Sequence, residues 1–234
     1  MEAIILAGGL GTRLREEIGK LPKPMAPING RPFIAYLLDY LSSQGVKRAT
    51  MAVSYRYDVL MDFLGFEYQG IKLEYSIEEE PQGTGGAIRK ALQKTKASQV
   101  FIVNGDTMFR VSLSKMKTMF LNQDADMVIG LKQMEHAARY GTVNTGEDHV
   151  ITGFSERRAT EGAGMINGGV YLAKKAFLME ICPQGTFSFE KEILEKKYSR
   201  YRFIGYSSDA FFLDIGVPLD YRQAHAAFKR FKDR

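Results

Sequence analysis

A glycine-rich segment near the amino terminus carries residue types that bind phosphate. It reads Leu6-Ala7-Gly8-Gly9-Leu10-Gly11-Thr12-Arg13 and directly follows an apolar run. Glycines let backbone N–H groups approach a ligand closely, because they permit positive φ and carry no Cβ. Arg13 places a positive charge beside that loop. The segment therefore predicts a phosphate-binding loop, with a glycine turn that merely closes a strand as the alternative.

Two common phosphate loops do not fit this segment. A dinucleotide-binding loop has a third glycine where Leu14 stands, and an acid about 20 residues further on, where residues 27–31 hold none. A P-loop ends in Gly-Lys-Ser or Gly-Lys-Thr, which this segment lacks. Hydride transfer with a dinucleotide is therefore disfavoured.

A second cation lies in a stiff setting. Lys23 stands between Pro22 and Pro24, and proline restricts both its own φ and the conformation of the residue before it. A lysine on such a support points in one direction. The alternative interpretation is a proline-rich surface bend with an idle lysine.

Three carboxylates precede a second glycine cluster, which reads Glu78-Glu79-Glu80-Pro81-Gln82-Gly83-Thr84-Gly85-Gly86. An ionised carboxylate accepts two donors side by side. Guanine offers such a pair from its ring N–H and its amino group, whereas uracil and thymine offer one ring N–H. The segment therefore favours a guanine base, with the following helix N-terminus near phosphate or ribose oxygens. A solvated acidic turn is the alternative.

Two aspartates each follow an apolar run. Asp106 comes after residues 100–103, and Asp214 comes after residues 210–213. In open α/β sheets ligands collect at the carboxyl ends of strands, so both acids are expected to face one crevice. Two carboxylates without clustered Cys or His make an oxygen-rich site that suits Mg²⁺ or Mn²⁺. Capping of the following turn is the alternative for each aspartate.

The elements that must position these residues alternate between strand and helix patterns. Strands are predicted at residues 3–6, 49–53, 72–75, 100–103, 127–131, 170–172 and 210–213, and helices at 33–41, 87–92, 113–120 and 219–231. The predicted fold class is α/β, with a mixed, mostly parallel central sheet flanked by helices. After Gly141, the pieces 142–143, 150–154 and 166–172 predict a small, β-rich, antiparallel or mixed addition.

Composition excludes several classes of protein. The 234 residues are 45% hydrophobic and 25% charged, with a net charge of +5, which is ordinary for a globular domain. The single cysteine, Cys182, excludes an internal disulfide and a multi-cysteine zinc site, and favours a reducing, cytoplasmic compartment. We expect no membrane contact, because no apolar run approaches the roughly 20 residues of a helical crossing. The scattered basic residues argue against nucleic acid as a partner.

Taken together, these motifs resemble the sugar-1-phosphate nucleotidyltransferases over nearly the whole chain. Residues 6–15 resemble the family's glycine-rich signature, 22–25 its Pro-Lys-Pro element, 80–87 its base-binding element and 167–171 its sugar-binding strand. The resemblance implies a single Rossmann-like (GT-A-like) domain over residues 1–234. Within it we expect a nucleotide-binding part at about 1–130, a sugar-binding part at about 131–205, and the second metal aspartate with a carboxy-terminal helix at about 206–234.

The resemblance also implies site residues. Arg13, Lys23, Asp106 and Asp214 are expected to be catalytic, with the two aspartates holding Mg²⁺ or Mn²⁺. The expected nucleotide-binding residues are Leu6, Ala7, Gly8, Gly9, Gly11, Thr12, Arg13, Lys23, Glu78, Glu80, Gly83, Thr84, Gly85, Asn104 and Gly105. The expected sugar-phosphate-binding residues are Gly141, Glu156, Arg157, Asn167, Gly168 and Glu190, and Arg157 stands where the family usually has lysine.

The reaction implied by the resemblance joins a sugar 1-phosphate to a nucleoside triphosphate and releases pyrophosphate. The acidic lead into residues 81–86 is similar to that of guanylyltransferases for manno-configured sugars, so GTP is the expected nucleotide. The compact length is similar to that of bacterial D-glycero-α-D-manno-heptose 1-phosphate guanylyltransferases. A uridylyltransferase, a mannose-1-phosphate guanylyltransferase and a non-catalytic nucleotide-sugar-binding homologue are the alternatives. The sequence leaves open whether the chain forms a homo-oligomer.

Overall fold

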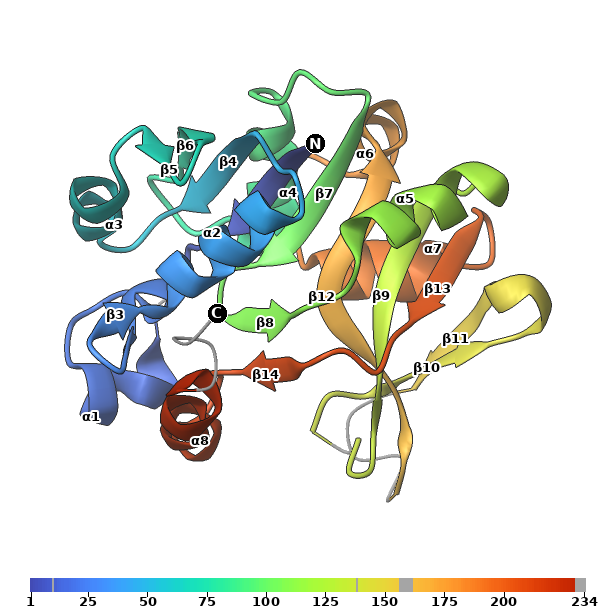
Figure 1. Cartoon of the computed structure of the whole chain (residues 1–234). Coiled ribbons are helices and arrows are strands. Elements are labelled where there is room, and N and C mark those ends of the chain that lie inside the picture. Colours follow the sequence, from blue (N-terminus) through green and yellow to red (C-terminus); the bar gives the residue numbers. More distant parts are fainter. Residues whose placement is uncertain (10, 138, 156–161, 230–234) are drawn as a thin grey trace.

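An eight-stranded sheet runs through the middle of the molecule (Figure 1). The computed structural model describes residues 1–9, 11–137, 139–155 and 162–229. The strand order is β13-β9-β12-β7-β1-β4-β6-β5. The pairs β1·β4, β1·β7, β4·β6 and β9·β13 are parallel, whereas β12 is antiparallel to both of its neighbours and β5 is antiparallel to β6. The predicted mixed, mostly parallel sheet is confirmed.

The bounds of the elements are as follows. The large sheet contains β1 (Glu2–Leu6), β4 (Arg48–Val53), β5 (Glu67–Tyr68), β6 (Ile71–Ile77), β7 (Gln99–Asn104), β9 (Met127–Met134), β12 (Gly164–Lys174) and β13 (Phe203–Ser207). The longer helices are α2 (Phe33–Ser43), α3 (Tyr57–Leu64), α4 (Gly83–Leu92), α5 (Leu113–Asn122), α6 (Lys175–Ile181) and α8 (Pro218–Lys229). Shorter helical pieces are η1 (Thr12–Leu14), α1 (Arg15–Ile18), η2 (Lys23–Met25), η3 (Glu147–His149), the π-helical η4 (Glu190–Leu194) and α7 (Glu195–Lys197).

Helices cover both faces of the large sheet, and strand residues alternate between two cores. Ala3 and Ile5 of β1 belong to one core, whereas Ile4 belongs to the other. The first core receives apolar side chains of α2, α3, α5 and α8, and the second those of α4, α6 and η4. Because neighbouring strand residues point to opposite faces, a strand buried on both sides reads as a continuous apolar run. This explains why β1, β4 and β7 could be predicted as strands from the sequence.

Three two-stranded sheets complete the fold. They pair β2 (Pro27–Ile28) with β3 (Arg31–Pro32), β8 (Thr107–Phe109) with β14 (Phe212–Asp214), and β10 (Thr142–Thr145) with β11 (Ile151–Ser155). The β10–β11 hairpin is the small antiparallel addition that the sequence predicted. Residues 166–172, also assigned to that addition, lie instead in β12 inside the large sheet, where Tyr171 and Leu172 are buried on opposite faces.

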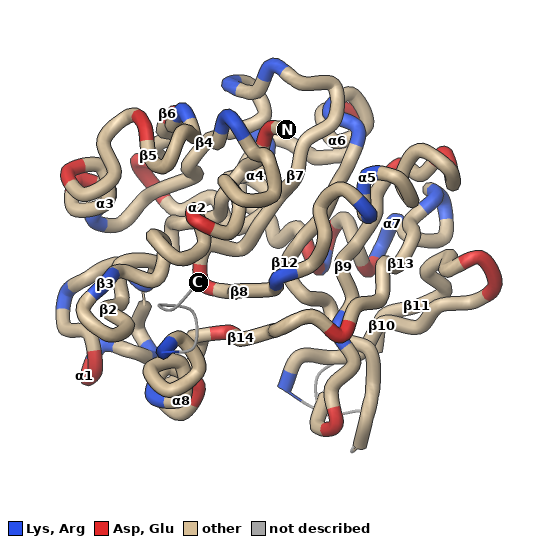
Figure 2. Tube along the Cα trace, viewed as in Figure 1, with Lys and Arg blue, Asp and Glu red and all other residues tan. Residues whose placement is uncertain are grey.

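Some elements were not predicted from the sequence. The strand β13 at the edge of the large sheet, and the helices α3 and α6, are additions to the predicted pattern. The predicted strand at 210–213 is a short ladder partner of β8, outside the large sheet. Figure 2 shows Lys and Arg interspersed with Asp and Glu along the elements. Within the described residues, no helix is long and apolar enough to cross a membrane.

Candidate active site

A cavity of about 380 Å³ opens at the carboxyl ends of β1, β4, β6 and β7. Its described lining residues are Leu6, Gly8, Gly9, Gly11, Thr12, Ala52, Ser54, Glu78, Pro81, Gly83, Thr84, Ala87, Asn104 and Asp106. Parallel strands end at one edge of a sheet, so the loops that follow them meet there. The two glycine clusters and the end of β7, separate in the sequence, therefore line one space.

The first glycine loop is held open toward this cavity. Ser54 donates its hydroxyl to the carbonyl of Gly8 at 2.8 Å, and a Cβ on Gly8 would lie 2.9 Å from that hydroxyl oxygen. Gly11 has φ +63°, a conformation that favours glycine. A Cβ on Gly9 would meet no described atom within 4 Å. The space beside Gly9 is therefore available to a ligand.

The glycine at position 105 brings β7 against the first loop. Its N–H donates to the carbonyl of Leu6 at 2.9 Å, and a Cβ there would lie 2.6 Å from the same oxygen. A larger residue would push apart the two backbones that carry Leu6 and Asp106. Gly105 thus acts through close backbone packing.

Lys23 lies between the two aspartates predicted to hold a metal. Its ammonium is 2.5 Å from Oδ2 of Asp106 and 3.9 Å from Oδ1 of Asp214, and the lysine side chain is 14% exposed. The β8–β14 ladder sets Asp214 opposite Thr107, and the N–H of Ile215 donates to the carbonyl of Asp106. Residues far apart in the sequence thus form one cluster, which we call the Lys–Asp cluster.

Burial and the neighbouring carboxylate of Asp106 raise the pKa of Asp214 above its ordinary value. The ammonium of Lys23 and the N–H of Gly216, which donates to Oδ1 of Asp214 at 2.7 Å, oppose that shift. Two carboxylates at close range disfavour each other's charge, and a cation between them offsets the repulsion. The two carboxylates of the cluster therefore attract a cation strongly.

The oxygen atoms here fit a divalent cation bound together with phosphate. Oδ1 of Asn104 is buried and has no hydrogen-bond partner within the described part of the chain, and it lies two positions before Asp106. No group of three or more His, Cys, Asp or Glu side chains that could hold a metal exists among the described residues. Mg²⁺ is commonly bound by one or two carboxylates plus substrate phosphates, so a pair of aspartates suffices.

A buried glutamate also lines the cavity, close to the first glycine loop, since a Cβ on Gly8 would lie 3.6 Å from Oε2 of Glu78. Glu78 is 7% exposed, and its Oε1 finds no hydrogen-bond partner in the described ranges. Burial raises the pKa of this carboxyl, opposed by the backbone of Gln82 and the charge of Lys90. Glu80 is exposed and is not among the described residues that line the cavity. Of the two acids predicted to bind a base, Glu78 is thus the one in the cavity.

The second glycine cluster is clamped against a distant segment. A Cβ on Gly85 would lie 2.0 Å from the ring of Phe187, and one on Gly83 would lie 2.5 Å from the carbonyl oxygen of Phe187. Thr84 donates its hydroxyl to Oε2 of Glu190 at 2.7 Å. Glu190, predicted to bind a sugar hydroxyl, therefore uses one oxygen to tie η4 to α4.

Of the other predicted sugar-binding residues, those that the structure describes do not line this cavity, although Gly169 packs against Asn104, which does. Asn167 donates its amide nitrogen to the hydroxyl of Tyr171 at 2.7 Å and accepts from the N–H of Gly169 at 3.0 Å. Gly141, Asn167 and Gly168 are not among the described residues that line the cavity. Glu156 and Arg157 lie outside the described residues.

Arg13, in contrast to the other predicted catalytic residues, forms no hydrogen bond or ion pair with the Lys–Asp cluster in the described part of the chain. It lies on η1, one residue beyond the last cavity-lining residue of the loop, and is exposed. Ser54, which holds Gly8, was missed by sequence reasoning. Its signal was its position directly after β4, at the same edge of the sheet as Asp106.

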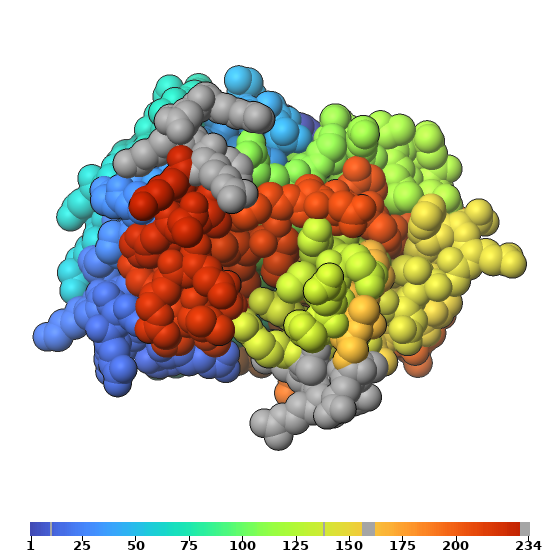
Figure 3. Space-filling view, turned by 60° about the horizontal axis from the view of Figure 1, so that its bottom comes forward, coloured from blue at the N-terminus to red at the C-terminus, as the bar shows by residue number. Residues whose placement is uncertain are grey.

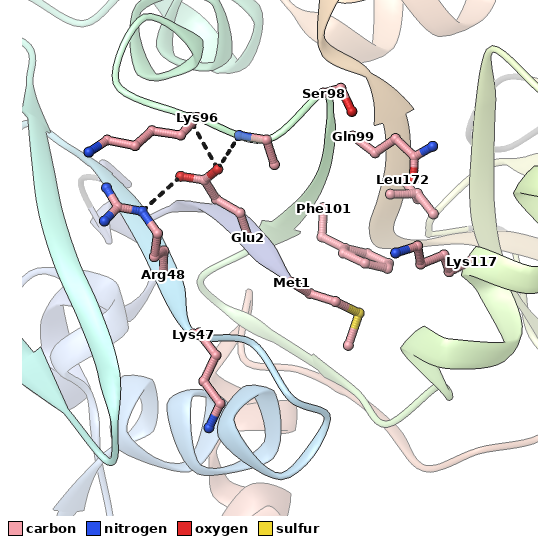
Figure 4. A pocket seen from close by; sticks show the side chains of 11 residues that line it. Met1, Glu2, Lys47, Arg48, Lys96, Ser98, Gln99, Phe101, Lys117 and Leu172 are labelled. Atoms are coloured by element: carbon pink, nitrogen blue, oxygen red, sulfur yellow. Dashed lines mark hydrogen bonds and ion pairs between the residues drawn. The ribbon is translucent and has the colours of Figure 1, made fainter.

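A larger cavity of about 470 Å³ lies at the opposite edge of the sheet (Figure 4). Glu2, the one acid among its described lining residues, accepts from the N–H groups of Lys96 and Ala97 at 2.9 and 2.6 Å and from Arg48 at 3.4 Å. The Glu2 carboxylate therefore holds residues 96–97 and Arg48 of β4 against the start of β1. The smaller cavity, with its glycine loops and the Lys–Asp cluster, is the candidate active site.

Comparison with known proteins identifies relatives of the whole chain. Residues 2–230 match the family described as Nucleotidyl transferase. A D-glycero-alpha-D-manno-heptose 1-phosphate guanylyltransferase of Aneurinibacillus thermoaerophilus is 46% identical over 231 residues, which cover 99% of this chain and all of that protein. A protein of the same name from Campylobacter jejuni is also 46% identical, over 94% of this chain and 97% of its own length.

Solved structures show the same architecture. HddC from Yersinia pseudotuberculosis superposes with a TM-score of 0.87 at 37% identity, covering 97% of this chain and 99% of that one. The same protein complexed with GMP-PN superposes with a TM-score of 0.85 at 36% identity, with the same coverage. The α/β fold predicted from the sequence is therefore shared with these proteins along nearly the whole chain.

Proposed function

Because this chain belongs to the nucleotidyl transferase family, we propose that it transfers GMP from GTP to D-glycero-α-D-manno-heptose 1-phosphate. The products are GDP-heptose and pyrophosphate. The Lys–Asp cluster beside the glycine-loop cavity is the observation that carries the transfer chemistry. The identity of 46% over 99% of the chain supports the heptose substrate, and the buried Glu78 supports the guanine base.

In the proposed reaction an oxygen of the sugar phosphate attacks the α-phosphorus of GTP. The new O–P bond forms as the bond between the α-phosphorus and the oxygen bridging to the β-phosphate breaks, and both electrons of that bond leave with pyrophosphate. A phosphate monoester has its second pKa near 6, so its attacking oxygen is largely anionic at pH 7. No side chain is required to remove a proton.

The main barrier is repulsion between two anions. Like charges about 4 Å apart repel by about 4 kcal/mol at an effective dielectric of 20. Lys23, seated beside both aspartates, is proposed to bridge the α-phosphate and the sugar phosphate. The N–H groups of the loop around Gly9 would hold the triphosphate, and Arg13 would stabilise the departing pyrophosphate.

Asp106 and Asp214 are the proposed holders of a divalent cation, with Mg²⁺ or Mn²⁺ as the candidates. When bound, that ion supplies positive charge that draws the α-phosphate and the sugar phosphate together. The chain's own contribution is to fix both carboxylates through the β8–β14 ladder. Glu78 is proposed to accept the ring N–H and amino group of guanine.

The remaining proposals concern the sugar and the setting of the enzyme. Gly141, Asn167, Gly168 and Glu190 are proposed to contact sugar hydroxyls, together with Glu156 and Arg157. The cytoplasm is the proposed compartment, because the single cysteine, Cys182, permits no disulfide within the chain.

Release of pyrophosphate tests this proposal. The purified chain is given Mg²⁺, D-glycero-α-D-manno-heptose 1-phosphate and each of GTP, ATP, UTP and CTP, and mannose 1-phosphate replaces the heptose in parallel reactions. We expect GTP with the heptose phosphate to give a kcat/KM at least about tenfold above every other pair. Faster release with UTP would identify a uridylyltransferase, and faster release with mannose 1-phosphate a different sugar. No release with any pair would identify a non-catalytic binding protein.

A further inference from the structure

A two-pronged ion pair joins the segment before β10 to the start of α8. Arg139 donates from Nη1 to Oδ1 of Asp220 at 3.2 Å and from Nη2 to Oδ2 at 2.5 Å. The side chain of Arg139 is 46% exposed, whereas that of Asp220 is 16% exposed. Parallel guanidinium–carboxylate bonds fix orientation as well as distance. The pair therefore sets how these two segments lie relative to each other.

A second contact links the segment before β10 to β14. The ring of Tyr140 packs edge-on against Phe212 of β14, with ring centroids 5.8 Å apart, and the guanidinium of Arg139 lies 5.1 Å from the centroid of the Tyr140 ring. Phe212 precedes Asp214 by two positions, and Asp220 follows it by six. The two contacts thus hold the chain in place both before and after Asp214.

Helix α8 is also bonded to the segments that follow the first glycine loop. From α8, the hydroxyl of Tyr221 donates to the carbonyl of Pro27 at 2.7 Å, and Arg222 pairs with Glu17 at 2.6 Å. Pro27 follows η2, which carries Lys23. In Figure 3 the red α8 lies beside the yellow-green segment around residue 140. The Arg139–Asp220 pair therefore connects the segment leading to Gly141 with elements that flank the Lys–Asp cluster.

We propose that Arg139 and Asp220 are positioning residues that fix the Tyr140–Gly141 segment against Asp214, so that the sugar phosphate is presented in line with the nucleotide. This inference rests on the proposed function, and it adds two residues to it. Water reaches Arg139, which is 46% exposed, so the pair should contribute only modestly to folding stability even though Asp220 is mostly buried. Loss of this pair should therefore appear mainly in the use of the sugar phosphate, with a small fall in the melting temperature.

The competing explanation is that Arg139 itself binds the sugar phosphate. Under that explanation Asp220 holds the arginine away from its substrate, and neutralising Asp220 leaves the use of the sugar phosphate unchanged or improves it. Under the positioning role, neutralising either partner breaks the same connection. The variant Asp220→Asn therefore separates the two explanations.

The test compares Arg139→Gln, Asp220→Asn, the double variant and Arg139→Lys with wild type in steady-state pyrophosphate release. We expect both single variants to raise KM for heptose 1-phosphate by about tenfold, because small misplacements of reacting groups are costly in rate and binding. KM for GTP should stay within about twofold, since the loops of the nucleotide cavity are untouched. The double variant should be no worse than either single one, because both remove one interaction. Arg139→Lys should recover part of the loss.

The control is Asp124→Asn, which removes the carboxylate of another ion pair, with Lys174, at a 94% exposed side chain. The affinity for GTP in calorimetric titration should be unchanged in all variants, and the melting temperatures should fall by no more than about 4 °C. An Asp220→Asn enzyme with wild-type KM for the sugar phosphate would overturn the inference, as would additive losses in the double variant. If wild type itself makes no GDP-heptose, the proposed function fails, and this result is distinct from an active wild type with unaffected variants.

Discussion

The ammonium of Lys23 lies 2.5 Å from Oδ2 of Asp106, although 83 residues separate them in the sequence. The contact joins η2, which follows the first glycine loop, to the end of β7. With Asp214 also within 3.9 Å, one cation offsets two carboxylates in a mostly buried setting. A metal ion and a phosphate arriving here would divide these partners between them, with the metal on the aspartates and the lysine on the phosphate.

The variant Lys23→Met tests this exchange through stability. Without the ammonium, the repulsion between Asp106 and Asp214 is uncompensated, so a divalent cation should stabilise the folded state more than it does in wild type. We expect the rise in melting temperature on adding Mg²⁺ to be larger in the variant by about 2–4 °C, which corresponds to about 1 kcal/mol for a chain of this size. Differential scanning calorimetry with and without MgCl₂ measures it. Equal rises in the two proteins would argue against a shared site.

Two glycine substitutions should separate binding from folding. A Cβ on Gly9 meets no described atom within 4 Å, so Gly9→Ala should keep the wild-type melting temperature yet raise KM for GTP by about tenfold or more, because the methyl group enters the proposed phosphate space. Gly85→Ala places its methyl 2.0 Å from the Phe187 ring. It should lower the free energy of unfolding by about 1–3 kcal/mol. Unchanged KM for GTP in Gly9→Ala would remove that loop from the phosphate site.

Glu78→Gln should raise the stability of the nucleotide-free protein and lower its affinity for GTP. Burial raises the pKa of Glu78 in the folded state, so folding disfavours its charged form. The stability contributed by a raised carboxyl pKa is present below the unfolded-state pKa and is lost as pH rises through the folded one. At pH 7 the Gln variant should therefore melt at a higher temperature than wild type, and the difference should disappear at a pH below the ordinary glutamate pKa.

The same variant should bind GTP more weakly by about 10- to 100-fold, since hydrogen bonds to a charged group contribute about 1.5–3 kcal/mol. Binding of UTP should change less, because uracil offers one ring donor where guanine offers two. Calorimetric titrations at pH 7.5 provide the comparison, with Glu79→Gln as the matched control from the exposed part of the same segment. Equal losses in the two variants would contradict a specific role for Glu78.

Local pattern predicted the elements that are buried on both faces. The predicted strand 100–103 lies in β7, and the predicted helix 33–41 lies in α2. A continuous apolar run indicates the strand, and apolar residues at helical spacing indicate the helix. The edge strand β13 was missed, since Phe203 and Ile204 are followed by Gly205, and such a short run is ambiguous. Residues 166–172 were placed in the addition because a sequence does not show which sheet a strand joins.

Residue types at strand ends predicted part of the site, whereas contacts between segments far apart in the chain could not be predicted from the sequence. Asp106 lies in the cavity because it follows the carboxyl end of β7, where ligands collect in such sheets, whereas Asp214 follows no strand of the large sheet. That Asp214 arrives through a two-stranded ladder with β8 depends on pairing between residues more than 100 positions apart. The pairs Ser54–Gly8 and Arg139–Asp220 are likewise side-chain contacts between distant segments, which no local motif marks.

The most direct test is the turnover of Asp214→Asn with GTP and heptose 1-phosphate at saturating Mg²⁺. Asp209→Asn, an exposed aspartate in the segment just before β14, serves as the matched control. If Asp214 helps to hold a catalytic metal ion, kcat for pyrophosphate release should fall by about 100-fold or more in Asp214→Asn, while the control keeps wild-type kcat. A kcat for Asp214→Asn within about twofold of wild type would contradict the metal assignment and the mechanism built on it.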